Sequence, residues 1–296
     1  MQRQIRPWLS SNGWLLAAGL LPGLLLIGAL IYFTGWAFAF SFTDLELVGR
    51  KSVDWSWIGW DNYVRLFTRR GFLDALYTTV IFTFFSAIIG QSVLGFLLAS
   101  ALRGTRGLLR NVVEVSIMLG WLLPDIVAAF LWSATTSKTG LVNSLVVTPF
   151  GLQPVNFLND LALQIVILAN IWKGTAWSYL LFIAALDSVP KEVIEASRVD
   201  GASTVQRAGY IVLPMIRSHI ATNMLFITIW TFTYFPLIYA LTGGGPGRQT
   251  QVLAIFMYEQ SFKIGKIGYG SAISVAMLLI VGVLSLFYIR LLREPK

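Results

Sequence analysis

The chain has 296 residues, of which 56% are hydrophobic and 12% are charged. Soluble domains carry roughly 25% charged residues, so this composition indicates a membrane protein. The sequence contains no cysteine, which excludes disulfides and thiol chemistry. The formal net charge is +8, and we interpret this excess as a signal of membrane orientation rather than of nucleic-acid binding.

Six segments are apolar enough to cross a bilayer, which needs about 20 apolar residues for a hydrocarbon layer of about 30 Å. Some are uncharged and others carry isolated polar groups such as Asp125 and Lys173; in chain order they occupy residues 14–41, 75–101, 115–137, 161–185, 215–242 and 271–289. Continuous runs predict helices, because a membrane barrel alternates apolar and polar residues in strands of about ten. The predicted fold class is an all-α integral membrane protein with six transmembrane helices.

The first apolar run is longer than the ~7–15 residues of a secretory-signal core, so we expect it to be retained as a transmembrane helix. It is followed by an external loop in which Trp55, Trp57 and Trp60 suit an aromatic belt at the headgroup level. A short surface helix is expected over residues 61–70. The predicted organisation is an N-terminal segment, a first helix, an external loop, a transmembrane core and a tail, at residues 1–13, 14–41, 42–71, 72–292 and 293–296.

Charge near the spans predicts their orientation. Six spans place both termini on one side, and the segments that share that side hold more Lys and Arg than the opposite ones. The link over residues 102–110 carries Arg103, Arg106 and Arg110 and no acidic residue. Positive charge marks the cytoplasmic side, so both termini are expected to be cytoplasmic.

The connection over residues 187–214 is too polar for the bilayer and predicts two short helices around a turn. Asp187 or Ser188 is the expected N-cap, with Pro190 in the first turn. Gly201 suits the left-handed end of the first helix, and Ser203 with Gln206 forms a capping-box pattern for the second. The segment could be a plain connector. A DNA-reading helix-turn-helix is disfavoured, because both ends are held in the membrane.

This connection resembles the EAA motif of ABC importer permeases. The resemblance is carried by Glu195-Ala196-Ser197-Arg198-Val199-Asp200-Gly201-Ala202-Ser203, by Gln206 and by Ile211-Val212-Leu213-Pro214. Further matches to carbohydrate importers, in the subunit class of the maltose and glycerol-phosphate permeases, are Asn170-Ile171-Trp172-Lys173, Ser188-Val189-Pro190-Lys191-Glu192 and Leu241-Thr242-Gly243-Gly244-Gly245-Pro246 with Thr250. The sequence departs from the motif at Ser197, Val205 and Ala208, where alanine, an aromatic residue and phenylalanine are common.

The resemblance implies that residues 187–214 form a cytoplasmic coupling loop that seats in a cleft on an ATPase subunit. Glu195 would supply charge, Gly201 the turn, and Leu213 with Pro214 the rigid join to the next helix. The full predicted coupling set is Glu192, Glu195, Ala196, Ser197, Asp200, Gly201, Leu213 and Pro214. The implied partners are a second permease subunit, two ATPase subunits, an extracytoplasmic solute-binding protein and membrane lipid, with no nucleic acid. The implied location is the inner membrane, crossed several times.

The sequence predicts no catalytic activity and no cofactor in this chain. No G-x-x-x-x-G-K-[ST] phosphate loop occurs, and the glycine-rich stretch after Leu241 lacks the Lys-Ser/Thr that would follow. One histidine and no cysteine give no convincing metal cluster or His-based triad. ATP and Mg²⁺ are therefore expected on the partner ATPase subunits.

Polar and aromatic residues inside the spans are the candidates for a solute path. A charge at mid-bilayer costs about 2.5–3.5 kcal/mol, so Lys173 should face protein or water, with Asp125 as its available partner. That pair either orients helices or contacts solute. The predicted path residues recur at helical spacing and are Asn170, Lys173, Gly174, Trp177, Trp230, Thr231 and Tyr234. The same stripes would also suit helix-packing seams.

The expected function is a permease subunit of an ABC importer that moves a sugar, either a di- or oligosaccharide or a sugar–polyol conjugate. The alternative is an ion-coupled secondary transporter, which would need coupling carboxylates at mid-membrane, where only Asp125 is plausible. A membrane enzyme is the third and least favoured class.

Overall fold

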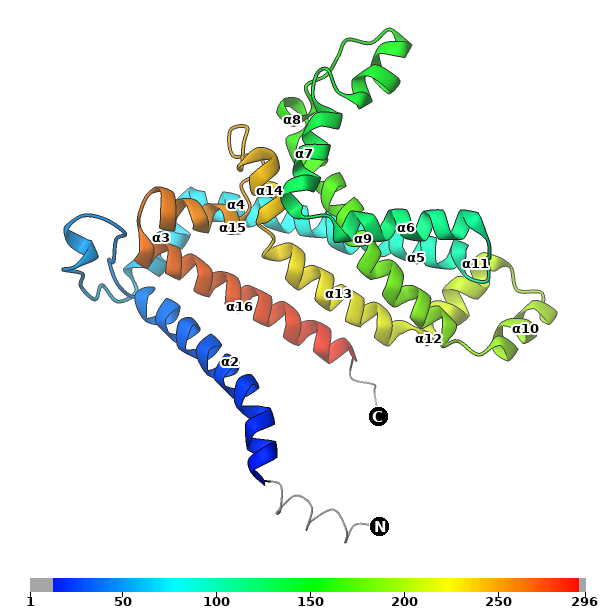
Figure 1. The fold of residues 1–296 in the computed structure, drawn as a ribbon, viewed down its shortest axis with the longest axis horizontal. Coiled ribbons are helices and arrows are strands. Elements are labelled where there is room, and N and C mark those ends of the chain that lie inside the picture. Colours follow the sequence, from blue (N-terminus) through cyan, green and yellow to red (C-terminus); the bar gives the residue numbers. More distant parts are fainter. Residues whose placement is uncertain (1–12, 293–296) are drawn as a thin grey trace. The chain divides into compact units, whose positions relative to one another are not determined.

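The structure is a computed structural model that describes residues 13–292 (Figure 1). Those residues are helical nearly throughout and contain no strand, apart from one isolated antiparallel bridge between Thr43 and Trp57. The predicted all-α class is confirmed. The segments predicted as cytoplasmic ends, residues 1–13 and 293–296, lie outside the described residues except for Gly13.

Four helices are long and apolar enough to cross a membrane without interruption. The first is α2 (Gly13–Phe40), and the second runs through α4 (Arg70–Thr83), the π-type turns of η2 (Phe84–Gln91) and α5 (Ser92–Leu102). The third and fourth are α9 (Ala162–Asp187) and α16 (Ile267–Leu292). They correspond to the apolar runs predicted at 14–41, 75–101, 161–185 and 271–289.

The span predicted over residues 115–137 is not one continuous helix. It is divided into α6 (Leu108–Leu122) and α7 (Asp125–Thr136), whose axes differ by 111°. Leu123 is extended, with φ −62° and ψ 134°, because the residue before a proline avoids the helical region. Pro124 stands at the N-cap of α7, where its missing N–H is not needed.

The span predicted over residues 215–242 is also divided. α13 (Arg217–Phe232) ends before a non-helical stretch, and Pro236 begins α14 (Pro236–Thr242). On the other side, the segment Thr204–Met215 meets α13 at 75°. Counting each bent pair as one span gives up to six crossings among the described residues. The number six therefore stays a prediction.

The described residues form two compact units, one of residues 13–65 with 260–275 and one of residues 66–259 with 276–292. In the first, the side-chain amide of Asn62 donates to the carbonyls of Ser41 (2.9 Å) and Thr43 (2.8 Å). These bonds tie α3 (Asp61–Thr68) to the end of α2. The short helix predicted at 61–70 is confirmed as α3.

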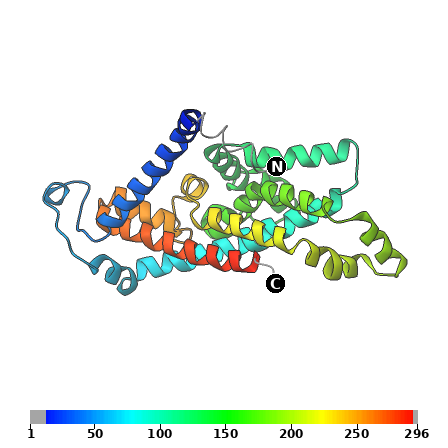
Figure 2. The ribbon, with the colours of Figure 1, turned by 90° about the horizontal axis from the view of Figure 1, so that it is seen from below.

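α9 is the central helix of the second unit and packs against η2, α5, α6 and α13 (Figures 1 and 2). A Cβ atom on Gly95 would lie 2.5 Å from the Cβ atom of Ser178, so α5 and α9 approach each other as closely as small residues permit. Toward its C-terminus, α9 contributes Tyr179, Phe182 and Leu186 to a buried core with Ala99 and Leu102 of α5.

Shorter elements complete the fold. They are η1 (Arg50–Ser52), η3 (Asn143–Val147), η4 (Thr148–Phe150), α8 (Phe157–Asp160), α10 (Lys191–Val199), α11 (Thr204–Arg207), η5 (Ala208–Val212), α12 (Leu213–Met215), α15 (Leu253–Tyr258) and η6 (Glu259–Lys263). Along the chain α8 precedes α9 and α10 follows it, and the two lie beyond opposite ends of that helix (Figure 1).

Candidate functional site

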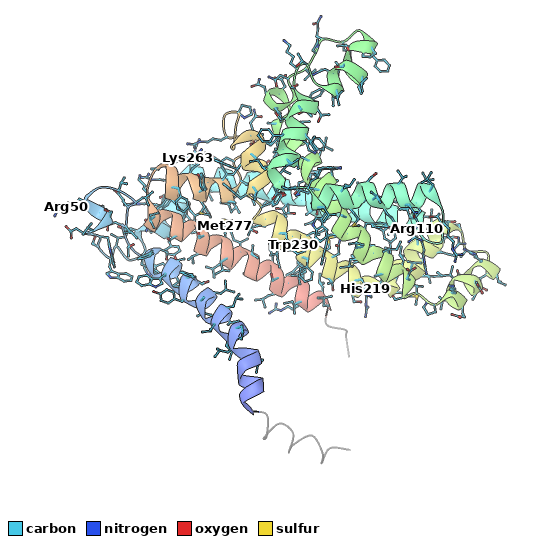
Figure 3. All side chains as sticks on the ribbon, in the orientation of Figure 1. Arg50, Arg110, His219, Trp230, Lys263 and Met277 are labelled. Carbon is cyan, nitrogen blue, oxygen red and sulfur yellow. The ribbon has the colours of Figure 1, made fainter. Side chains whose placement is uncertain are left out.

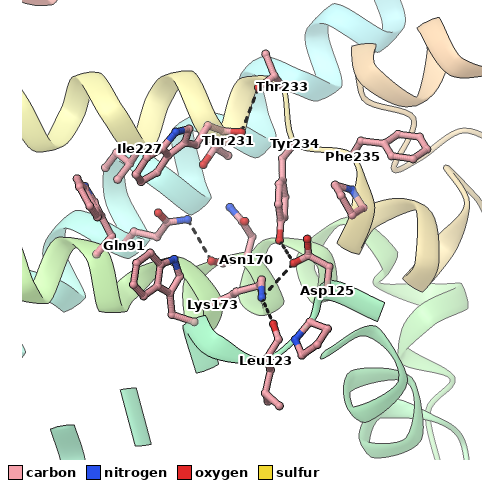
Figure 4. A pocket seen from close by; sticks show the side chains of 16 residues that line it. Gln91, Leu123, Asp125, Asn170, Lys173, Ile227, Thr231, Thr233, Tyr234 and Phe235 are labelled. Atoms are coloured by element: carbon pink, nitrogen blue, oxygen red, sulfur yellow. Dashed lines mark hydrogen bonds and ion pairs between the residues drawn. The ribbon is translucent and has the colours of Figure 1, made fainter. Parts of the chain in front are cut away.

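A cavity of about 490 Å³ lies in the second unit, and all seven predicted path residues line it (Figure 4). α9 supplies four of them and the α13 region three. The full lining is Gln91, Trp121, Leu123, Pro124, Asp125, Asn170, Lys173, Gly174, Trp177, Ile227, Trp230, Thr231, Thr233, Tyr234, Phe235 and Pro236. The structure thus brings together two stripes that are separated in the sequence by the whole of residues 187–214.

Two helix breaks open at this cavity. Leu123 and Pro124 lie between α6 and α7, and Tyr234 and Phe235 lie between α13 and α14. Backbone that is not helical survives at membrane depth only where protein or a cavity covers it. Transport proteins place solute sites at such discontinuous helices, so the breaks are a second indication of a solute path.

An ion pair joins the two breaks through α9. Lys173 Nζ lies 3.1 Å from Asp125 Oδ1 and also donates to the carbonyl oxygen of Leu123. The hydroxyl of Tyr234 donates to the same Asp125 Oδ1 at 2.6 Å. The predicted pairing of Lys173 with Asp125 is confirmed, whereas its role in orienting helices or in contacting solute is a separate question.

Asn170 and Gly174 meet η2 on the next face of α9. Asn170 Nδ2 donates to Ser86 Oγ at 2.9 Å, and the Asn170 carbonyl accepts from Gln91 Nε2 at 3.1 Å. Asn170 is only 5% exposed, so its donor group already holds two helices together. Gln91 is held over Gly174, where the absence of a side chain makes room for it.

Aromatic rings form one wall of the cavity. The rings of Trp177 and Trp230 are 4.7 Å apart at 72°, and Phe226 and Trp121 lie within 6.5 Å of Trp177. Such edge-to-face pairs are individually favourable by about 0.5–1.5 kcal/mol. Trp177 Nε1 is buried without a hydrogen-bond partner. Trp230, near the C-terminal end of α13, is 45% exposed (Figure 3).

Sequence reasoning missed several lining residues, chiefly Gln91, Trp121 and Phe235. A signal existed for Gln91, because it is a primary amide within an uncharged apolar run. Phe235 precedes Pro236, and a proline within a helical pattern is a signal of a helix boundary. Trp121 had no distinguishing signal in the sequence, because a tryptophan in a transmembrane segment can equally well contact lipid.

The connection after α9 has the two helices and the turn that were predicted. Gly201 has φ +78°, the left-handed region that favours glycine. Ser203 Oγ accepts from the backbone N–H of Gln206, and Gln206 Oε1 accepts from the backbone N–H of Ser203, which confirms the capping box. The predicted N-cap is wrong: α9 continues to Asp187, the Ser188 hydroxyl donates to the Ala185 carbonyl, and Pro190 occupies the cap position of α10.

The eight predicted coupling residues divide between the surface and the core. Ser197 is 4% exposed, with its hydroxyl bonded to the Ile194 carbonyl at 2.7 Å, and Leu213 is partly buried. The others are exposed: Glu192, Glu195, Ala196, Asp200, Gly201 and Pro214. Ile194 and Leu213 pack on the core that contains Phe182 and Leu186 of α9. The surface of the loop is thus mechanically connected to the helix that lines the cavity.

The described residues contain no group of three or more His, Cys, Asp or Glu side chains arranged to hold a metal ion. The charged groups of the cavity are already paired with each other. The arrangement suits binding of a polar molecule with an apolar face.

Residues 91–295 match the family described as the binding-protein-dependent transport system inner membrane component. This chain belongs to that family. Its role is therefore that of a multi-pass membrane permease subunit in an importer, and the ion-coupled alternative is set aside. Membership also assigns the chain to the membrane component of a transport system.

Individual relatives cover most of the chain. It is 30% identical over 239 residues to the trehalose/maltose transport system permease protein MalF of Thermococcus litoralis, covering 79% of each chain. It is 32% identical to the trehalose transport system permease protein SugA of Mycobacterium tuberculosis, covering 90% of this chain and 85% of the relative. It is also 32% identical to the sn-glycerol-3-phosphate transport system permease protein UgpA of Pectobacterium atrosepticum, covering 91% of each.

The fold is shared with a solved transporter. A chain in the crystal structure of a bacterial ABC transporter involved in the import of the acidic polysaccharide alginate superimposes with a TM-score of 0.76 at 24% identity. The match covers 97% of this chain and 98% of that one. The permease therefore shares the membrane fold of that transporter chain over 97% of its length.

Proposed function

We propose that this permease subunit moves a sugar inward, either a di- or oligosaccharide or a sugar–polyol conjugate, through the cavity between α9 and α13. The single observation that carries the proposal is the convergence of the seven predicted path residues on one cavity. The names of relatives that transport trehalose or maltose support a sugar as the solute.

The chemistry of the lining suits a sugar. Trp177, Trp230 and Trp121 offer faces and edges for the C–H surfaces of a pyranose ring. Gln91, Thr231 and the Asp125 carboxylate offer donors and acceptors for its hydroxyls. An apolar pocket with a few convergent polar groups is the usual form of a small-molecule site.

The energy for transport is proposed to enter through residues 187–214. The exposed face of α10, including Glu192, Glu195 and Ala196, would seat on an ATPase subunit. Its displacement would pass through Ile194 and Leu213 into the core around Phe182, and so into α9. This is rigid-body motion of a packed helix, a common form of conformational coupling.

The assembly implied by this mechanism contains a second permease subunit, two ATPase subunits that bind ATP and Mg²⁺, and an extracytoplasmic solute-binding protein. This chain would contribute no cofactor and no catalytic residue. Six crossings with both termini on the cytoplasmic side would bring the coupling loop to the ATPase. Arg103, Arg106 and Arg110 lie on that side in this topology, in agreement with the positive-inside rule. Arg110, at the start of α6, lies at the same end of the second unit as α10 and α11 (Figure 3).

Reconstitution tests this proposal. The complete complex in proteoliposomes, supplied with its solute-binding protein, should accumulate labelled di- or oligosaccharides only when ATP is present. An ionophore that collapses ion gradients should leave the uptake unchanged. Uptake that continues without nucleotide, or that concerns only non-carbohydrate solutes, would contradict the proposal.

A further inference from the structure

The cavity contains two formally charged side chains, whose opposite charges cancel. Among its sixteen lining residues, Asp125 and Lys173 are the members of the Asp, Glu, Lys and Arg classes, and their charged atoms are 3.1 Å apart. The wall that a solute meets therefore has no net charge. Relatives include proteins named for uncharged trehalose and for anionic glycerol phosphate, so family membership does not decide which charge the path accepts.

The ammonium group of Lys173 is occupied by acceptors of the protein itself. It contacts Asp125 Oδ1 and the Leu123 carbonyl, and its side chain is 12% exposed. An anionic solute would have to displace one of these acceptors to gain a cationic partner. It would also approach the Asp125 carboxylate, whose charge repels it strongly where water is scarce.

The carboxylate of Asp125 is held in place, yet one of its two oxygen atoms can still accept a hydrogen bond. Lys173 and Tyr234 both bond its Oδ1 atom, whereas Oδ2 has no hydrogen-bond partner among the described residues. Oδ2 can accept a hydroxyl, which is a group that a neutral sugar carries in number. The bond from Tyr234 fixes the carboxylate against rotation, so the acceptor keeps its direction.

We propose that Asp125 sets the charge selectivity of the path: by neutralising Lys173 and presenting its second oxygen, it restricts the cavity to uncharged, hydroxyl-rich solutes. This inference rests on the proposed function, since it assumes that solute enters this cavity. It adds the substrate charge class and a specificity-determining residue.

The test measures binding to the cavity without the selectivity of a solute-binding protein. The purified complex in nanodiscs, with no solute-binding protein added, is titrated with trehalose and with trehalose 6-phosphate, and binding is followed by saturation-transfer NMR. The wild type should bind trehalose at least about tenfold more tightly than trehalose 6-phosphate. Equal affinities in the wild type would overturn the inference without any variant.

Charge variants separate selectivity from structure. Asp125→Asn leaves Lys173 unneutralised and should raise the affinity for trehalose 6-phosphate relative to trehalose by about tenfold. The size of the site barely changes, so exclusion by size cannot produce that shift. The double variant Asp125→Asn with Lys173→Gln is neutral again and should return to the wild-type ratio. A purely structural pair would weaken both probes together, and an unchanged ratio in Asp125→Asn would overturn the inference.

Failure of the proposed function has a different signature. If neither probe binds the complex in any variant, the cavity is not a sugar path and both statements fall. If both probes bind but the ratio of their affinities does not change with the charge at residue 125, the sugar path is supported and only the role of Asp125 in selectivity is contradicted.

Discussion

The side-chain amide of Gln91 occupies the space that a side chain on Gly174 would need. A Cβ atom built on Gly174 would lie 2.3 Å from Gln91 Cδ, well inside contact distance. Gln91 in turn donates to the Asn170 carbonyl, one turn earlier on α9. α9, which contributes four of the sixteen cavity-lining residues, is thereby fixed against η2 at one particular separation.

Gly174→Ala should destabilise the permease by about 1–3 kcal/mol, because the added methyl group overpacks a site with no room. Thermal unfolding of the complex in detergent measures this loss. Gly282→Ala is the matched control, since nothing lies within 4 Å of its Cβ position in α16. Combining Gly174→Ala with Gln91→Ala should cost less than the sum of the single changes; strict additivity would contradict the contact.

Glu195→Lys should reduce solute-stimulated ATP hydrolysis by roughly fivefold or more while insertion and assembly are unchanged, because reversing an exposed charge in a docking face disfavours association. Asp160→Lys, an equally exposed acid in α8, is the control and should leave hydrolysis intact. Stimulated hydrolysis at the wild-type level in Glu195→Lys would remove this residue from the coupling surface.

Trp230→Ala should raise the sugar concentration that gives half-maximal uptake by about fivefold, since one aromatic contact contributes about 0.5–1.5 kcal/mol. Trp177→Ala should weaken uptake in the same direction with assembly preserved. Phe150→Ala removes a ring that is 79% exposed and lies outside the cavity, so it is the control. An unchanged uptake curve for both tryptophan variants would exclude the aromatic wall from the path.

The stability of the loop that follows α2 should depend on pH through Asp44. The ammonium group of Lys51, 2.8 Å away, and the backbone N–H of Ser56 hold the pKa of Asp44 below its ordinary value. Because the pKa of Asp44 is lower in the folded state, its carboxylate stabilises the loop at pH values above the ordinary carboxyl pKa of about 4. This stabilisation is lost as the pH falls through the lowered pKa. Hydrogen exchange over residues 44–56 should therefore accelerate in strong acid, and Asp44→Asn should remove that dependence on pH. Identical pH profiles of exchange in the wild type and in Asp44→Asn would contradict the role of Asp44.

Much of this architecture could be predicted from local sequence. Hydrophobic length alone located the four uninterrupted helices, since the bilayer demands it. Gly201 and the Ser203–Gln206 box follow from backbone chemistry within a few residues. Lys173 needed a partner in a span, and Asp125 was the available opposite charge. The helix signals depend on residues close together in the sequence, and Asp125 was the one acidic residue available within a span to pair with Lys173.

The helix breaks could not be placed by the same means. Pro124 and Pro236 are visible in the sequence, but transmembrane helices tolerate proline when neighbours satisfy the freed backbone groups. At the break after α6, the Leu123 carbonyl accepts a hydrogen bond from Lys173, which belongs to another helix and is distant in the sequence. Likewise, Gln91 joined the site only because Gly174 leaves space for it.

Residues 187–214 are proposed to be cytoplasmic and to transmit force from an ATPase, and a single cysteine introduced into this segment tests both properties. The chain has no native cysteine, and Val199 is 88% exposed at the end of α10. Val199→Cys should cross-link to the ATPase subunit in the intact complex and react with a membrane-impermeant maleimide only from the cytoplasmic side. Labelling from the exterior, or the absence of any ATPase adduct in an active complex, would contradict the account.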